Sequence, residues 1–229
     1  MGEAADGRRA SAALDLVVLG SVFAVGACGI VYELLAATAA SYVLGNAVVP
    51  FSTVIGVYLA AMGLGALRSE RVAARVAARF IEVELALAVV GGALGPALLS
   101  GALPAGWFSP ALYVGVATAG ALVGMELPLL VRLLSADLPF GDRVGRAFFA
   151  DYAGALVASV LFPRVMVPAM GLWRTGFAAA AVNALVALGG TFALQKALGR
   201  SAFWLRLGSV GLLAALLGAA LRGPPAGGD

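Results

Sequence analysis

The chain has 229 residues, of which 62% are hydrophobic and 12% charged, with a formal net charge of +3 and a mean hydropathy of +1.01. Soluble domains contain about 45–50% apolar and about 25% charged residues, so this composition excludes a water-soluble globule and predicts a polytopic membrane protein. The absence of histidine, the single Cys28 and the scattered basic residues favour neither a metal or cofactor site nor nucleic-acid binding.

Seven segments are apolar over about the 20 residues that a membrane-spanning helix needs. They are rich in Ala and Leu and lack the alternation of a membrane barrel, which predicts an all-α bundle of about seven transmembrane helices. The first run is longer than a signal-peptide core, so we expect it to remain as a helix. The segments lie near 14–42, 51–67, 80–102, 109–135, 147–169, 174–197 and 203–221. We expect a cytoplasmic segment at 1–13, a transmembrane domain at 14–221 and a disordered tail at 222–229.

Basic residues predict the orientation of this bundle. The strongly basic loops all fall on the side of the N-terminus, and they carry Arg68, Arg71, Arg75, Arg79, Arg143, Arg146, Lys196 and Arg200. By the positive-inside rule, we expect the N-terminus to lie inside and the C-terminus outside. The stretch Arg68–Phe80 has apolar residues four apart, so it is either a short interfacial helix or a plain basic loop.

Ionisable residues inside the spans are the most informative ones, because charges in a bilayer are costly and usually face a partner or a functional site. Glu33 and Arg164 both lie in the predicted outer half. We expect them to form an ion pair that fixes helix one against helix five. Arg164 is bracketed by Pro163 and Pro168, which predict either a simple kink or a broken helix at a binding site.

Four carboxylates share the predicted inner half: Glu82, Glu84, Glu126 and Asp151. Glu82 and Glu84 are expected to extend toward the interface beside Arg79. Glu84, Glu126 and Asp151 form a candidate cation or proton site if they have no arginine partner. The alternative is that arginines such as Arg132 neutralise them and the charges only hold helices together.

The order of several short motifs resembles the membrane region of bacterial polyamine aminopropyltransferases, the fused spermidine-synthase-like proteins. The resemblance covers roughly helices one to six and includes Gly124-Met125-Glu126-Leu127-Pro128 and Asp151-Tyr152-Ala153-Gly154. It also includes the Tyr-Glu pair of helix one and the Gly-Leu-Gly that ends helix two. The motif positions are Tyr32, Gly45, Gly65, Pro128, Arg132, Gly154 and Asn183.

One departure from this family bears on function. Its enzymes resemble Rossmann-like methyltransferases in their catalytic domain, and this sequence shows no such βαβ pattern or Gly-rich turn. The resemblance therefore does not imply that this chain catalyses aminopropyl transfer, and we assign it no catalytic residue. We expect a membrane subunit or anchor for a separate aminopropyltransferase-like partner. Two alternatives stay open: a small transporter or channel for polyamine-like cations or protons, and a structural subunit of a larger membrane complex.

Overall fold

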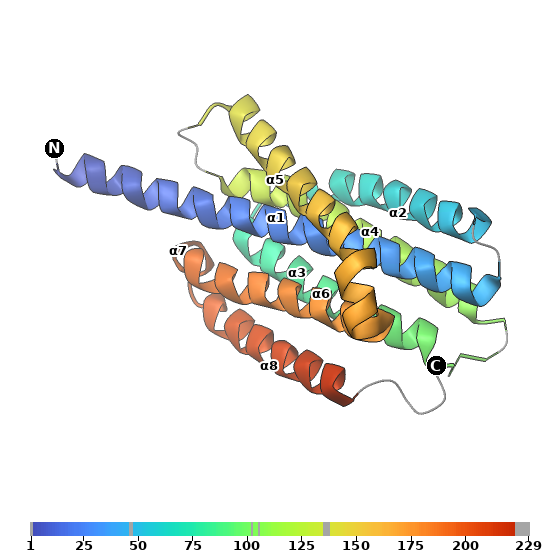
Figure 1. Cartoon of the computed structure of the whole chain (residues 1–229). Coiled ribbons are helices and arrows are strands. Elements are labelled where there is room, and N and C mark those ends of the chain that lie inside the picture. The colour runs from blue at the N-terminus through green and yellow to red at the C-terminus, as the bar shows by residue number, and fades with distance from the viewer. Residues whose placement is uncertain (1, 46–47, 102, 105, 135–137, 223–229) are drawn as a thin grey trace.

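The computed structural model describes residues 2–45, 48–101, 103–104, 106–134 and 138–222, and side chains from Ala12 onward. The described chain is helical, as predicted (Figure 1). The elements are α1 (Gly2–Leu44), α2 (Val48–Ser69), α3 (Val76–Leu99), α4 (Phe108–Leu133), α5 (Phe140–Leu161), a π-helical segment η1 (Phe162–Met166), α6 (Val167–Ala193), a short α7 (Gln195–Leu198) and α8 (Ser201–Arg222). The expected tail lies outside the described residues, apart from Arg222.

Six helical stretches are long and apolar enough to cross a membrane, which supports the prediction of a membrane protein. The fifth stretch, Phe140–Ala193, has 54 residues and joins two of the segments expected from the sequence. A straight helix of this length would measure about 80 Å, far more than the roughly 30 Å hydrocarbon core. The chain therefore has to turn within this stretch.

The turn lies at Gly171, whose φ of 70° and ψ of 170° are not helical. The preceding π-helical segment contains Pro163 and Arg164, where a break in helix five is one of the predicted outcomes. A proline removes a backbone donor, and π-helical turns accommodate such a loss inside a longer helix. Figure 1 shows α6 returning along the bundle after this turn.

The long α1 lies at the centre of the bundle and packs against α2, α4, α5 and α6, while α3 packs against α4, α6 and α8. Glycines permit the closest crossings. A Cβ on Gly65 of α2 would overlap the Ala121 carbonyl of α4, and one on Gly154 of α5 would overlap the Phe23 carbonyl of α1. Both residues are among the motif positions, and small residues of this kind let membrane helices approach closely.

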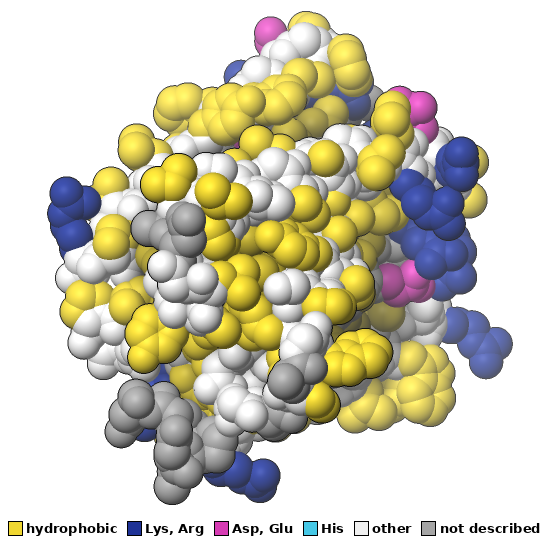
Figure 2. Space-filling view, turned by 90° about the vertical axis from the view of Figure 1, so that its right-hand side faces the viewer, with side chains coloured by type: hydrophobic (Ala, Val, Ile, Leu, Met, Phe, Trp, Pro, Cys, Tyr) yellow, Lys and Arg dark blue, Asp and Glu magenta, His cyan; other side chains and the backbone are white. Residues whose placement is uncertain are grey.

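The loop between α2 and α3 is a plain basic loop and contains no interfacial helix. The helix α2 continues to Ser69 and α3 begins at Val76. Arg75 precedes α3 with a φ of 56°, which ends any continuous helix at this point. Gly45, one of the motif positions, lies directly after α1 with a φ of 69°, a backbone conformation that favours glycine. Figure 2 shows hydrophobic side chains over much of the viewed end of the bundle, with Lys and Arg gathered at its edges.

Candidate functional site

A chain of buried hydrogen bonds joins three helices in the middle of the bundle. The Tyr32 hydroxyl of α1 donates to Asn183 Oδ1 of α6 at 2.8 Å. The Asn183 amide in turn donates to Glu84 Oε2 of α3 at 2.7 Å. All three side chains are at least 99% buried. Gly91 of α3 makes room for the Tyr32 ring, because a Cβ at Gly91 would overlap it.

Glu126 of α4 completes this cluster and brings a second carboxyl group next to Glu84. The two carboxyl groups are close enough for their charges to interact. Glu126 is 1% exposed, and neither of its carboxyl oxygens has a hydrogen-bond donor among the described residues; Glu84 Oε1 has none either. Two carboxylates need a proton or a cation between them when they face each other away from water. This pair is the centre of the candidate site.

Asp151 of α5 lies beside this carboxyl pair, at the crossing of α5 with α1. A Cβ on Gly26 of α1 would overlap the Asp151 carboxyl group, which places the two helices in direct contact there. The Asp151 side chain is partly exposed and is near enough to Glu126 for their charges to interact. The structure therefore places Glu84 beside Glu126 and Asp151 near Glu126, while the described residues do not gather the three carboxylates of the candidate cation or proton site into one group.

The arginines that the sequence offered as partners do not neutralise these carboxylates. Arg132 donates to the Ser69 carbonyl at 2.7 Å and to the Val72 carbonyl at 2.8 Å. It thereby holds the loop that follows α2. Arg79 forms an ion pair of 2.8 Å with Glu82, so the interfacial interpretation applies to Glu82. It does not apply to Glu84, which is fully buried.

The expected ion pair between Glu33 and Arg164 is not formed in this structure. Glu33 is 8% exposed, but the described residues provide no ion pair for it. Arg164 lies in η1 and its side chain is exposed. The sequence indicates the depth of each residue along its own helix but not the direction of its side chain around the helix axis. Arg164 lies in the π-helical segment, where that direction differs from the one in a regular α-helix.

Two further polar contacts inside the spans were not predicted. The Tyr58 hydroxyl of α2 donates to the Gly29 carbonyl of α1 at 2.8 Å. Arg206 of α8 donates to the Thr191 carbonyl at 3.1 Å and stacks over the Phe192 ring at 3.8 Å from its centroid. The contact of Arg206 could have been expected from the sequence, because a charged residue inside an apolar span requires a partner.

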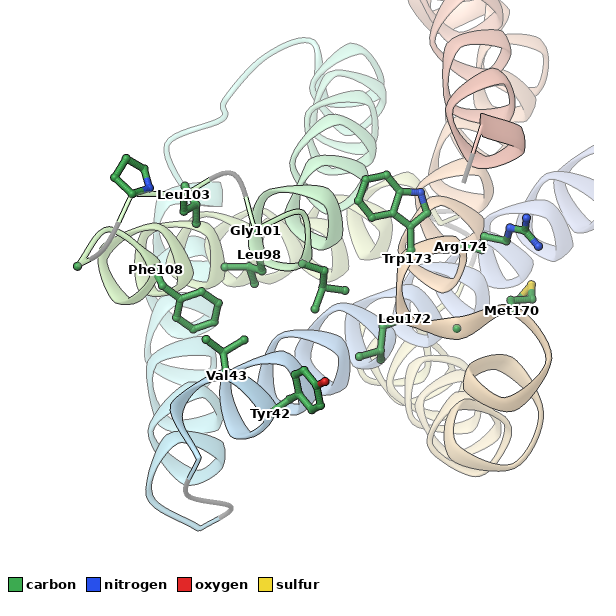
Figure 3. A pocket seen from close by; sticks show the side chains of 14 residues that line it. Tyr42, Val43, Leu98, Gly101, Leu103, Phe108, Met170, Leu172, Trp173 and Arg174 are labelled. Atoms are coloured by element: carbon green, nitrogen blue, oxygen red, sulfur yellow. The ribbon is translucent and has the colours of Figure 1, made fainter. Parts of the chain in front are cut away.

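A cavity of about 640 Å³ lies at the C-terminal end of α1, away from the carboxyl pair in the middle of the bundle. Figure 3 shows Tyr42 and Val43 of α1, Phe108 of α4 and Trp173 of α6 around it, with Arg174 nearby. Its lining is mainly apolar, and Trp173 Nε1 is buried without an acceptor in the described part of the chain. None of the described residues that line this cavity is a carboxylate.

The described residues contain no group of three or more His, Cys, Asp or Glu side chains placed to hold a metal ion. The carboxyl pair has two acidic ligands and one amide, with Asp151 set to one side. A proton or a singly charged cation is the chemistry that such a small, enclosed set of oxygens can accommodate.

Comparison with known proteins agrees with the resemblance seen in the motifs. The chain is 44% identical over 174 residues to the polyamine aminopropyltransferase of Leptospira interrogans serogroup Icterohaemorrhagiae, a match covering 76% of this chain and 35% of that protein. It is 43% identical over 210 residues to polyamine aminopropyltransferase 2 of Ralstonia nicotianae, covering 90% of this chain and 40% of the relative. The chain is related to polyamine aminopropyltransferases.

A third relative, the polyamine aminopropyltransferase of Mycobacterium tuberculosis H37Rv, is 35% identical over 195 residues, which is 79% of this chain and 36% of that protein. The chain thus spans less than half the length of the curated relatives it matches. No protein-family model and no solved structure matches it.

Proposed function

We propose that this chain is the membrane-embedded unit of an aminopropyltransferase system and holds a separate catalytic protein at the inner face of a bacterial inner membrane. The observation that carries the proposal is the match to Ralstonia nicotianae, which takes in 90% of this chain and 40% of a protein named as an aminopropyltransferase. The membrane-spanning part of the proposal follows from the six apolar helical stretches.

The proposed topology has seven crossings, with the N-terminus inside and the C-terminus outside. The bend at Gly171 supports this count, because it divides Phe140–Ala193 into two arms. The basic loop after α2 and the start of α5 then face the cytoplasm. Phe140 is 68% exposed at the beginning of α5, next to Arg143 and Arg146. These two segments form the proposed docking surface for the catalytic protein, together with Asp137, which lies outside the described residues.

The test is purification of the tagged chain from native membranes in a mild detergent, with mass spectrometry of the proteins that accompany it. We expect an aminopropyltransferase-like protein with the intact chain and less of it with Phe140→Ser/Arg146→Gln. The control variant is Phe203→Ser/Arg222→Gln at the two ends of α8, which changes an exposed aromatic residue and an arginine elsewhere. Recovery of the intact chain alone, after chemical crosslinking in the membrane, would contradict the proposal.

A second candidate function is passage of a proton or a small cation through the bundle. The observation that favours it is the set of three buried carboxyl oxygens without donors on Glu84 and Glu126. A purely structural role for these charges would require each to be paired, and arginines do not pair with them here.

Proteoliposomes that contain a pH-sensitive dye test this second function, with spermidine as the candidate polyamine in a parallel radiotracer assay. We expect the flux of the transported cation to fall in Glu126→Gln, which removes a carboxylate but keeps the side-chain shape. The matched control is Glu82→Gln, since Glu82 is bound to Arg79 at the surface. Equal flux in protein-free vesicles and in vesicles containing the intact chain would exclude this function.

A further inference from the structure

A groove with a basic rim opens between α2 and α3, at the end of the bundle where α2 finishes. It encloses about 610 Å³ and is separate from both the carboxyl pair and the cavity beside Trp173. One wall of the groove is the loop after α2 and the other is the first part of α3. Its floor consists of Leu122 and Met125 of α4.

The groove exists because α2 and α3 both pack against α4 and are not packed extensively against each other. Arg132 of α4 helps to keep it open, since its hydrogen bonds to the Ser69 and Val72 carbonyls fix the path of the loop between the two helices. The wall contributed by α3 repeats at helical spacing, with Arg79 and Val83 followed by Ala86 one turn further into the membrane. The groove therefore changes from charged to apolar along its length.

The charge of the rim is strongly positive. Three arginines line it, Arg68, Arg71 and Arg79, and Glu82 is the one acidic residue among its described lining residues. Glu82 is already bound to Arg79 at 2.8 Å, which leaves Arg68 and Arg71 to present net positive charge. A planar guanidinium group matches phosphate oxygens in a two-pronged arrangement, and arginine is the preferred residue for this recognition.

The position of the rim indicates that such a phosphate belongs to a lipid headgroup and not to a soluble compound. Arg68 lies at the end of an apolar span, and Leu64, one helical turn before it, is 68% exposed on an apolar stretch of α2. The arginines therefore stand at the level of lipid headgroups, above a groove whose floor is hydrocarbon-like. A soluble phosphate compound would use the charged rim but not the apolar floor.

We propose that this groove binds one anionic phospholipid, with its phosphate between Arg68 and Arg71 and an acyl chain along Leu122 and Met125. The occupant is a lipid of the inner leaflet such as phosphatidylglycerol. The rim of the groove belongs to the loop after α2 that is also part of the proposed docking surface. Lipid binding requires only the membrane and this chain, so it can be tested without the catalytic partner.

Native mass spectrometry of the detergent-purified full chain tests the proposal, with palmitoyl-oleoyl phosphatidylglycerol and the matching phosphatidylcholine titrated in separate series. We expect tighter retention of phosphatidylglycerol. An arginine near the membrane surface contributes about fivefold to the affinity for an anionic lipid, so the double variant Arg68→Gln/Arg71→Gln should bind it about 25-fold more weakly. Arg75→Gln is the matched control, because Arg75 lies in the same loop and does not line the groove.

The floor is tested by Ala86→Phe, which fills the groove without changing its charge and should reduce retention of phosphatidylglycerol. Added inorganic phosphate at millimolar concentration should not displace the lipid, whereas displacement would indicate a site for a soluble phosphate compound. The proposal is overturned if the intact chain retains the two lipids equally, a comparison that requires no variant to fold. It is also overturned if Arg75→Gln weakens binding as much as the double variant does.

Discussion

Asn183 of α6 donates a hydrogen bond of 2.7 Å to Glu84 of α3, a residue 99 positions earlier in the sequence. Because Asn183 also accepts from Tyr32 of α1, one amide group links three helices at the most buried level of the bundle. Both ends of this link are sealed from water and from lipid, so each group depends on Asn183 for its hydrogen bond. This dependence makes Asn183 the residue through which the site and the stability of the fold are connected.

Replacing Asn183 by Leu should therefore destabilise the protein. The change leaves the Tyr32 hydroxyl without its acceptor and Glu84 without its donor, and interhelical hydrogen bonds in membranes contribute about 0.6–2 kcal/mol each. We expect a lower midpoint of thermal unfolding in detergent, measured by tryptophan fluorescence. Ser159→Ala is the control, because the exposed Ser159 hydroxyl bonds only to the Leu156 carbonyl of its own helix. Similar midpoints for the two variants would show that the buried link contributes little.

The sequence predicted much of this arrangement and missed the part that depends on rotation around helix axes. Glu84, Glu126 and Asp151 were expected at a common depth, because position along an apolar span can be counted from its ends. Glu33 and Arg164 were also placed at a common depth, yet their side chains do not meet. Depth alone does not fix the direction of a side chain, since a shift of one residue turns it by about 100°.

The division of the long helical stretch could be predicted from its apolar runs, but its geometry could not. Pro163 and Pro168 indicated a disturbance, whereas the actual change of direction lies at Gly171. A proline alters hydrogen bonding within a helix, but only glycine readily adopts the combination of φ and ψ found at residue 171. The sequence did place the connection between the expected segments 147–169 and 174–197, and Gly171 lies in it, but it did not indicate the π-helical segment that precedes the turn.

Gly171→Ala tests this turn. An L side chain at a φ of 70° and a ψ of 170° costs about 1–3 kcal/mol, so the variant should unfold at a lower temperature than the intact protein. Gly189→Ala is the matched control, since Gly189 lies inside α6 and a Cβ there would contact nothing within 4 Å. It should leave stability unchanged or raise it slightly, because alanine favours a helix more than glycine does. A destabilised control with an unaffected Gly171→Ala would place the critical glycine elsewhere.

The crossing of α2 and α4 provides a test with two glycines on one helix. A Cβ on Gly65 would overlap the Ala121 carbonyl, a backbone atom that cannot move without separating the helices, whereas a Cβ on Gly63 would meet nothing within 4 Å. Gly65→Ala should therefore cost about 1–3 kcal/mol, as overpacked sites do, while Gly63→Ala should be neutral or stabilising. Thermal unfolding of both variants in the same detergent measures the difference. Equal effects would indicate that α2 and α4 are less closely packed than described.

The missing contact between Glu33 and Arg164 leads to a prediction opposite to the one that an ion pair would give. If they formed a buried pair, neutralising one partner would strand the other charge and cost about 3–5 kcal/mol, and neutralising both would restore part of the loss. Since Arg164 is exposed and the two are unpaired, the effects of Glu33→Gln and Arg164→Gln should simply add. Their coupling energy in a double-mutant cycle should lie within about 0.5 kcal/mol of zero, the usual limit for residues that do not touch.

The cycle is measured from the unfolding midpoints of the four proteins, with Tyr32→Phe and Asn183→Leu as the reference cycle for a pair in contact. A coupling above about 1 kcal/mol for Glu33 and Arg164 would mean that they meet in the membrane after all, and that η1 presents Arg164 toward α1.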